Sequence, residues 1–249
     1  MRNMKQSEFP DSNIIGQEIC CGAVYPLSVV QGFQQGSITE LDNSVLVWHF
    51  CGFAFLLGEP SDKDIDSIFA MMQQAKADGK RLVLFSEKQS VTEAFSKLGA
   101  VIEKRYFYQF AQQKANEVVL PDGFAVKPID SQILPLLGGR IKPSFSWDSD
   151  ESFLGKGVGF CAMHGQIPAA WAFSAAVSDD EIDIGVETAE QYRGKGLASA
   201  VVNKTVQYVL STGKKPVWAC HSENTASQKT AEKTGFVKTG ECFTIRLEN

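Results

Sequence analysis

The sequence predicts a mixed α/β fold, in which a mixed central sheet is flanked by helices and the chain is built from two similar halves. In the second half, Ile182, Ile184 and Val186 are spaced by two, which indicates a strand with one buried face. A short turn containing glycines follows, and apolar residues then recur at roughly helical spacing from Leu197 to Gly213. Strands that alternate with helices in this way are typical of layered α/β domains.

Two stretches of the chain share one order of elements, which is the second observation behind this fold class. Residues 79–107 read as a strand, a helix ending in Leu98-Gly99, and a strand. Residues 213–244 read in the same order, with a helix ending in Thr234-Gly235. We interpret the pair as a weak internal repeat of a strand–helix–strand unit, with chance similarity as the alternative.

In the first half we expect helical or irregular structure up to about Gln35. Ser44–Leu57 is rich in Val, Phe and Trp, which indicates a buried strand pair or one long strand. Glu59–Asp62 signals a turn and an N-cap, and an amphipathic helix then ends near Gly79. The remaining elements of this half are a strand, a helix and a strand, expected at residues 81–86, 91–98 and 101–110.

The second half is expected to open with a strand over Phe124–Pro128 and a helix from about Asp130. Residues 143–150 read as a loop, in which Phe145 and Trp147 either line a substrate cleft or simply pack. Two strands joined by a hairpin turn at Gly165-Gln166 are expected next, at residues 158–164 and 167–177.

Length and composition limit the organisation of the chain. Its 249 residues, 44% of them hydrophobic, are enough for two domains. Polar residues between Gln112 and Asp122 break the pattern of elements, so we expect domains over residues 1–116 and 117–249.

Charge and cysteine usage exclude several classes of protein. The net charge of −5 argues against a nucleic-acid partner. The longest apolar stretch, Val45–Gly58, is too short to span a bilayer, and no apolar segment follows Arg2 and Lys5, so we expect neither a membrane partner nor a secretory signal. The six cysteines form no Cys-x-x-Cys pair, so we expect no metal site. Four of them lie in apolar, strand-like runs, which suits buried residues in a reducing cytoplasm. The oligomeric state is not indicated.

Glu187–Ser199 carries the strongest ligand-binding signal. Gly194 and Gly196 lack a Cβ, so a ligand can approach the backbone, and the helix start that follows offers free N–H groups to a phosphate. A P-loop would need Ser or Thr after Lys195, where Gly196 stands. A dinucleotide fingerprint is matched at only two of its three glycine positions. The remaining interpretations are a glycine-rich turn without a ligand and the pattern Arg-x-x-Gly-x-Ala.

Arg193, Gly196 and Ala198 fill that last pattern. It resembles the acetyl-CoA pyrophosphate loop of the GCN5-related N-acetyltransferases, the GNAT family. The stretch from Asn224 to Phe236 is similar to the family's following helix, and with Trp218 it looks most like the branch that contains the zwittermicin A resistance proteins. The resemblance covers the chain from Phe124 onward. Together with the internal repeat, it implies two tandem GNAT-like halves, of which the N-terminal half is degenerate because it lacks the motif.

The resemblance implies a function as well as a fold. The family transfers an acetyl group from acetyl-CoA, its co-substrate, to an amine, here the amine of a small molecule. By the same resemblance Thr188 would pair with the pantetheine arm, and Asn224 would lie near that arm or would simply cap its helix. The residues implied to bind the cofactor are Thr188, Arg193, Gly194, Lys195, Gly196, Leu197, Ala198, Ser199 and Asn224.

The reaction needs a base, because an ammonium ion has no lone pair with which to attack a thioester. Glu181, Asp183 and Glu187 alternate with the apolar residues of the predicted strand, so they share one face. Either this face lines the cleft and supplies the base, or it is a solvated strand face. Many family members place a tyrosine acid where Ala231 stands here. A non-catalytic acetyl-CoA-binding module, or pseudoenzyme, is therefore the alternative function.

Overall fold

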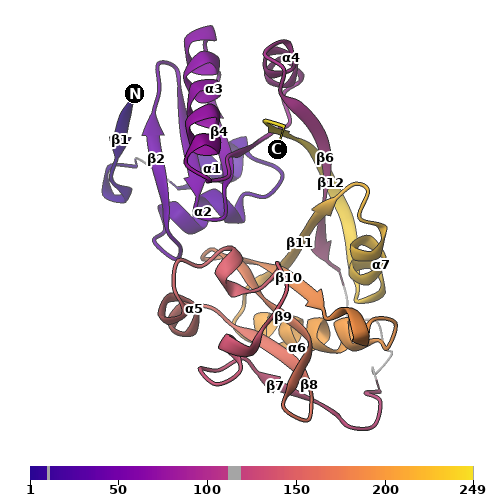
Figure 1. Ribbon diagram of the computed structural model, residues 1–249. Helices are drawn as coiled ribbons and strands as arrows, with labels where there is room; N and C mark the ends of the chain where they lie inside the picture. Colours follow the sequence, from indigo (N-terminus) through magenta and orange to yellow (C-terminus); the bar gives the residue numbers. More distant parts are fainter. Residues whose placement is uncertain (10–11, 112–118, 249) are drawn as a thin grey trace. The chain divides into compact units, whose positions relative to one another are not determined.

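The computed structural model describes residues 1–9, 12–111 and 119–248 (Figure 1). The chain forms two compact units. The first unit comprises Met1–Phe107, His221–Glu223 and Gly240–Asn249, and the second comprises Tyr108–Cys220 and Asn224–Thr239. The predicted domain boundary, between residues 116 and 117, lies outside the described residues and stays a prediction.

The first unit is a sheet covered by helices. Its strands follow the order β1-β2-β3-β4-β5-β12-β6, with β4 and β5 parallel. The predicted strand pair is confirmed as the antiparallel hairpin of β3 and β4. The helices and strands that begin in this unit are β1 Arg2–Met4, α1 Asn13–Glu18, α2 Val24–Val30, β2 Gly36–Glu40, β3 Ser44–His49, β4 Phe53–Gly58, α3 Asp62–Ala77, β5 Val83–Ser86, α4 Gln89–Lys97 and β6 Val101–Phe110.

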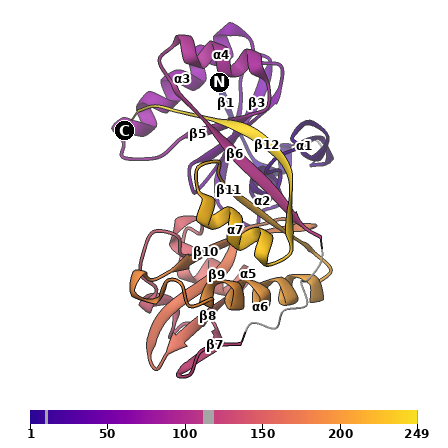
Figure 2. The same ribbon diagram turned by 90° about the vertical axis from the view of Figure 1, so that its right-hand side faces the viewer.

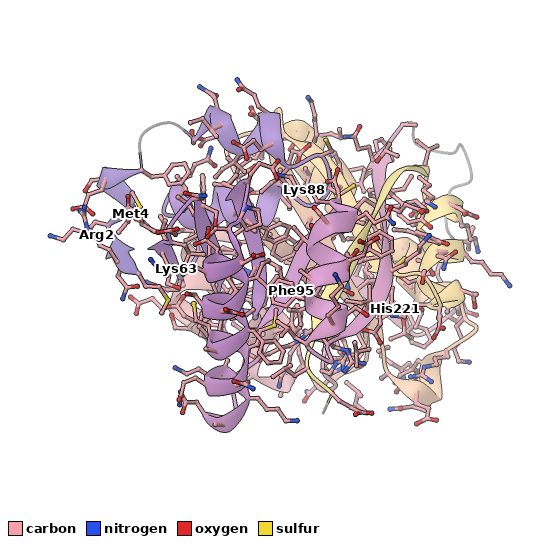
Figure 3. All side chains as sticks on the ribbon, turned by 90° about the horizontal axis from the view of Figure 1, so that it is seen from above. Arg2, Met4, Lys63, Lys88, Phe95 and His221 are labelled. Carbon is pink, nitrogen blue, oxygen red and sulfur yellow. The ribbon has the colours of Figure 1, made fainter. Side chains whose placement is uncertain are left out.

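The core of the first unit forms because α3 and α4 each carry an apolar face. Ile68 and Met72 of α3 pack with Phe95 of α4 (Figure 3) in one buried cluster. Leu46 and Leu84, from β3 and β5, supply the sheet side of that cluster. The helices are therefore held by burial of apolar surface rather than by their intrinsic propensity.

The second unit is also a sheet with helices. Its strands follow the order β6-β11-β10-β9-β8-β7, and α6 contacts β8, β9 and β10 (Figure 2). Neighbouring pairs from β7 to β10 are antiparallel, whereas β10 and β11 are parallel. The elements that begin in this unit are β7 Phe124–Pro128, α5 Asp150–Lys156, β8 Gly159–His164, β9 Ile167–Val177, β10 Glu181–Thr188, α6 Leu197–Ser211, β11 Lys215–His221, α7 Thr225–Lys233 and β12 Phe236–Arg246.

Two local predictions in the second unit are wrong. The helix expected from Asp130 is a turn, because the Asp130 carboxylate accepts hydrogen bonds from the N–H groups of Gln132 and Ile133, and only a single 3₁₀ turn, Leu134–Leu136, follows. Conversely, α5 was not foreseen after the predicted loop, although the Ser149 side chain caps it by accepting from the Ser152 N–H.

The order strand–helix–strand–helix–strand occurs twice, as β4–α3–β5–α4–β6 and as β10–α6–β11–α7–β12. Both last strands, β6 and β12, run through both units (Figures 1 and 2). In the first unit, Phe243–Ile245 of β12 pair antiparallel with Leu84–Ser86 of β5. The C-terminal residues therefore complete the sheet of the first unit. Local sequence patterns do not indicate this pairing of distant segments.

Candidate functional site

The site begins where two parallel strands part. β10 pairs with β11 only over Glu181–Asp183, opposite Lys215–Val217. β10 continues to Thr188, and β11 continues within the second unit to Cys220. Beyond Asp183 the β11-facing edge of β10 is thus open along these described residues. Such an edge has backbone N–H and C=O groups available to an extended ligand arm.

The glycines after β10 adopt a backbone conformation that other residues avoid. Gly194 and Gly196 have φ angles of 78° and 75°, and an added Cβ would meet no atom within 4 Å at either position. Conformation rather than crowding therefore requires glycine here. Gly196 is the N-cap of α6, which has neither a side-chain cap nor an acidic residue in its first turn. The free N–H groups and the positive dipole end of α6 are thus available to an anion.

A cavity of about 600 Å³ lies at this helix start. Every residue that the sequence predicts for cofactor binding lines it: Thr188, Arg193–Ser199 and Asn224. Four residues with cationic side chains, Arg193, Lys195, Lys229 and Lys233, line it together with one acidic residue, Glu187. Clustered cations around an uncapped helix start favour a ligand with several phosphate charges.

Lys229 and Lys233 were missed by the sequence reasoning. They lie four residues apart on α7, so they share one face of that helix. The same spacing is visible in the sequence and was the signal that could have found them.

Two hydrogen bonds fix the start of helix α7, one within the helix and one to β11. The Asn224 side chain accepts from the Ser227 N–H at 3.1 Å, so its capping role is confirmed. Trp218 Nε1 donates to Ser227 Oγ at 3.1 Å. Ala231 is fully buried, so the position where many family members carry a tyrosine belongs to the core and does not line the cavity.

The three candidate bases do not converge on the cavity. A strand rises about 3.3 Å per residue, which puts Glu181 about 20 Å from Glu187 along β10. Glu181 is half-buried opposite Lys215; burial raises the pKa of its carboxyl, Lys215 lowers it and Asp180 raises it further. Asp183 is buried at the last pair before the strands part. Of the three, only Glu187 lines the cavity.

The aromatic residues of the unit have different roles. Trp147 is buried and its Nε1 donates to the Ser174 carbonyl, so it packs rather than lines a cleft. Tyr192 does line the cavity, and its hydroxyl lies 3.3 Å from His164 Nδ1. Phe124 stacks on His164, and both rings contact Tyr192, so the tip of the β8–β9 hairpin is tied to the residue just before Arg193.

The open edge of β10 and the cation-lined helix start offer a surface for an anionic ligand with an extended arm, and comparison with known proteins identifies the class of protein. The chain belongs to the GNAT acetyltransferase family, whose model matches residues 28–244. It is therefore an acyltransferase enzyme. The match begins far upstream of Phe124, so it extends over most of the first half as well.

Individual relatives have low sequence identity to this chain. The chain is 28% identical over 201 residues to YdfB, an uncharacterized N-acetyltransferase of Bacillus subtilis (strain 168), covering 78% of this chain and 77% of that protein. A GCN5-related N-acetyltransferase-like protein from Streptococcus suis 89/1591 is similar in fold, with a TM-score of 0.71, 23% identity and coverage of 98% and 95%. A tandem GNAT protein from the clavulanic acid biosynthesis pathway has a TM-score of 0.59, with 12% identity and coverage of 98% and 96%.

Among the described residues, no three His, Cys, Asp or Glu side chains group as metal ligands would. No helix in the described ranges combines the length and the apolar character that crossing a bilayer requires.

Proposed function

We propose that the protein transfers the acetyl group of acetyl-CoA to the amine of a small molecule, at the cavity of the second unit. The observation that carries this proposal is the uncapped start of α6, surrounded by four cationic side chains beside the open edge of β10. Acetyl-CoA has phosphates at one end and an extended amide-containing arm at the other. Each part has a matching surface here.

The phosphates would lie against the N–H groups that follow Gly196, with Arg193 and Lys195 supplying positive charge. The arm would run along the open edge of β10, where Val186 and Thr188 line the cavity. The thioester would then lie toward the point where β10 and β11 part, next to Asp183.

The chemistry is a direct transfer. The amine must be neutral, so its proton first passes to a base or to water. Its nitrogen then forms a bond to the thioester carbonyl carbon, the carbon–sulfur bond breaks, and the CoA thiolate takes up a proton. The products are an amide and CoA. Glu187 and Asp183 are the carboxylates nearest the cavity and the strand junction, and Glu181 is the candidate farthest along β10.

We also propose that the first half is degenerate and holds no second acetyl-CoA. Its cavity at the ends of β4 and β5 has a volume of about 40 Å³. Both backbone groups of Gly58 are occupied there: its N–H donates to Glu18 Oε2 at 2.6 Å, and its carbonyl accepts from Lys88 Nζ (Figure 3) at 2.9 Å. An added ligand arm would have no free edge at this strand end.

The narrower assignments rest on the sequence. The pattern from Trp218 to Phe236 supports the zwittermicin A resistance-like branch, whose acceptors would be small amines. None of the six cysteines is part of a disulfide and five of them are buried, which suits a reducing compartment such as the cytoplasm.

The test combines binding with turnover. Acetyl-CoA is titrated into the protein by calorimetry, and thiol release is then followed with a panel of small primary and secondary amines. One bound acetyl-CoA per chain and amine-dependent thiol release support the proposal. Binding without turnover on any amine would favour the non-catalytic module, for which the buried Ala231 speaks. No binding at all would overturn both.

A further inference from the structure

The backbone of a single residue in the second unit, Ile141, is held by two side chains. The Ile141 N–H donates to Glu187 Oε2 at 2.5 Å, and the Ile141 carbonyl accepts from Trp171 Nε1 at 2.8 Å. Trp171 and Glu187 are direct cross-strand partners on β9 and β10. Their side chains therefore leave the sheet side by side and bind the two ends of one residue's backbone.

The neighbouring glycine fits the same arrangement. Gly139 has a φ of 71°, and a Cβ added there would overlap the Glu187 carboxylate. Gly138, one residue earlier, has an ordinary φ and open space around it. The carboxylate thus lies directly against the backbone of Gly139–Ile141, and only glycine fits at position 139.

This segment lies on the face of the sheet opposite α6. Phe160, Ala172 and Val186 are successive cross-strand partners, so they share a face, and the Phe160 ring contacts Tyr208 of α6. Trp171 and Glu187 occupy the next positions along their strands and therefore point to the other face.

We propose that Glu187 is a positioning residue: with Trp171 it clamps residues Gly139–Ile141 as a wall on the acceptor side of the cavity, and it does not serve as the base. This inference rests on the proposed function. Helix α6 and its loop occupy one face and would hold the cofactor, so the amine approaches from the other face, where the clamped segment lies.

The contacts of the Glu187 carboxylate also argue against a role as the base. A base must present an oxygen to the amine, directly or through one water. Here Oε2 accepts a backbone N–H, and Oε1 lies against Gly139. Abstracting a proton would require Glu187 to release the segment it holds. A carboxylate that anchors backbone can be replaced by an amide that still accepts the bond, whereas a base cannot.

The experiment uses that difference. Glu187→Ala and Gly139→Ala are compared with Glu187→Gln and with Gly138→Ala, the matched control. Three quantities are measured: hydrogen exchange of the Ile141 amide, acetyl-CoA affinity by calorimetry, and kinetics with the amine that gave the fastest thiol release. Loss of this part-buried hydrogen bond predicts about tenfold faster exchange and about tenfold higher KM for the amine in Glu187→Ala and Gly139→Ala. Acetyl-CoA affinity should change little.

Glu187→Gln should restore exchange protection and most of the turnover, with the acidic limb of the pH–rate profile in place. Gly138→Ala should keep the exchange rate of the parent protein. The inference is overturned if Glu187→Gln is as inactive as Glu187→Ala while Ile141 stays protected, because that marks a base. It is also overturned if Glu187→Ala leaves the exchange of Ile141 unchanged. Should no amine turn over, the proposed function fails, and the exchange measurement still decides whether the clamp exists.

Discussion

Helices α3 and α6 follow corresponding strands of the two units, yet they begin in opposite ways. Ser61 caps α3, and the Asp64 carboxylate accepts hydrogen bonds from the backbone of Asp42, Asn43 and Ser61. Helix α6 begins at Gly196 without a side-chain cap or a first-turn acid. The Ser61 side chain and the first-turn acids thus cap the start of α3, whereas the N–H groups at the start of α6 have no side-chain cap.

The ends of the preceding strands differ in the same sense. Glu18 and Lys88 occupy the backbone groups of Gly58 at the end of β4. Thr188, at the end of β10, lines an open cavity instead. One frame can thus serve as a structural half or as a ligand site, and the difference lies in whether a few polar side chains fill its backbone groups.

Gly196→Glu should have the largest effect on acetyl-CoA affinity, because it places a negatively charged side chain at the uncapped start of α6. A Cβ is strained at this φ, and a carboxylate would repel phosphates at close range, so acetyl-CoA affinity should fall at least about 100-fold. Calorimetry measures this. Gly155→Glu, on exposed α5 and away from the cavity, makes the same chemical change and should leave the affinity intact. Equal losses in both variants would show that the loop is not the site.

Asp64→Ala should destabilise the first unit without changing acetyl-CoA binding by the second unit. Several buried donors would lose their acceptor, so the free energy of unfolding should fall by about 2–4 kcal/mol. Burial raises the pKa of the Asp64 carboxyl, but its hydrogen bonds outweigh this and lower it overall. The lowered pKa stabilises the fold above the unfolded-state pKa, about 3.9, and this contribution is lost as pH falls through the native pKa.

Urea unfolding of Asp64→Ala across pH checks this, with the exposed first-turn Asp62→Ala as control. Acetyl-CoA affinity should not change in either variant. A tenfold loss of affinity in Asp64→Ala would contradict the separation of roles between the two units.

Lys229→Ala and Lys233→Ala should sharpen the comparison by testing charge alone. Each removes one exposed cation from the cavity wall, so each should weaken acetyl-CoA binding by about three- to tenfold at low salt, and less at high salt. Lys204→Ala, on the exposed side of α6, is the matched control. If the acetyl-CoA affinity of the parent protein did not depend on salt, the proposed electrostatic contribution of these lysines would be wrong.

Glu181→Gln should have the smallest effect, and it should be stabilising. Burial raises the pKa of this carboxyl, so the native state holds its proton to higher pH than the unfolded chain does. Stability therefore falls as pH rises from the unfolded-state pKa, about 4.3, through the native pKa. Thermal unfolding should show a higher Tm for Glu181→Gln at pH 7 and a vanishing difference at pH 4. A lower Tm at pH 7 would contradict this.

Much of the fold was predictable because its signals are local. The hairpin of β3 and β4, the Ser61 cap and the turn at Gly165 each follow from residue types within a few positions. The helix expected from Asp130 failed because one carboxylate folds back on its own backbone, which competes with a helix. The pairing of β12 with β5 could not be predicted, since strand pairing between distant segments leaves no local pattern.

The same rule holds for the candidate site: its local patterns could be read from the sequence, and contacts between distant segments could not. The glycine turn before α6 was predictable because its glycines and the adjacent arginine form a local pattern, and its ligand stays a prediction. The role of Glu187 was not, because its partners Gly139 and Ile141 lie far away in the sequence and meet it only in the fold. Lys229 and Lys233 were predictable in principle from their helical spacing.

The most direct test of the difference between the two units is the hydrogen-exchange footprint of acetyl-CoA on the intact chain. We predict slower exchange of backbone amides at residues 186–199 and 224–233, which surround the cavity of the second unit. Residues 58–64 and 86–91, the corresponding positions of the first unit, should exchange at the same rate with and without acetyl-CoA. Comparable protection in both sets, or none at residues 193–199, would contradict the account.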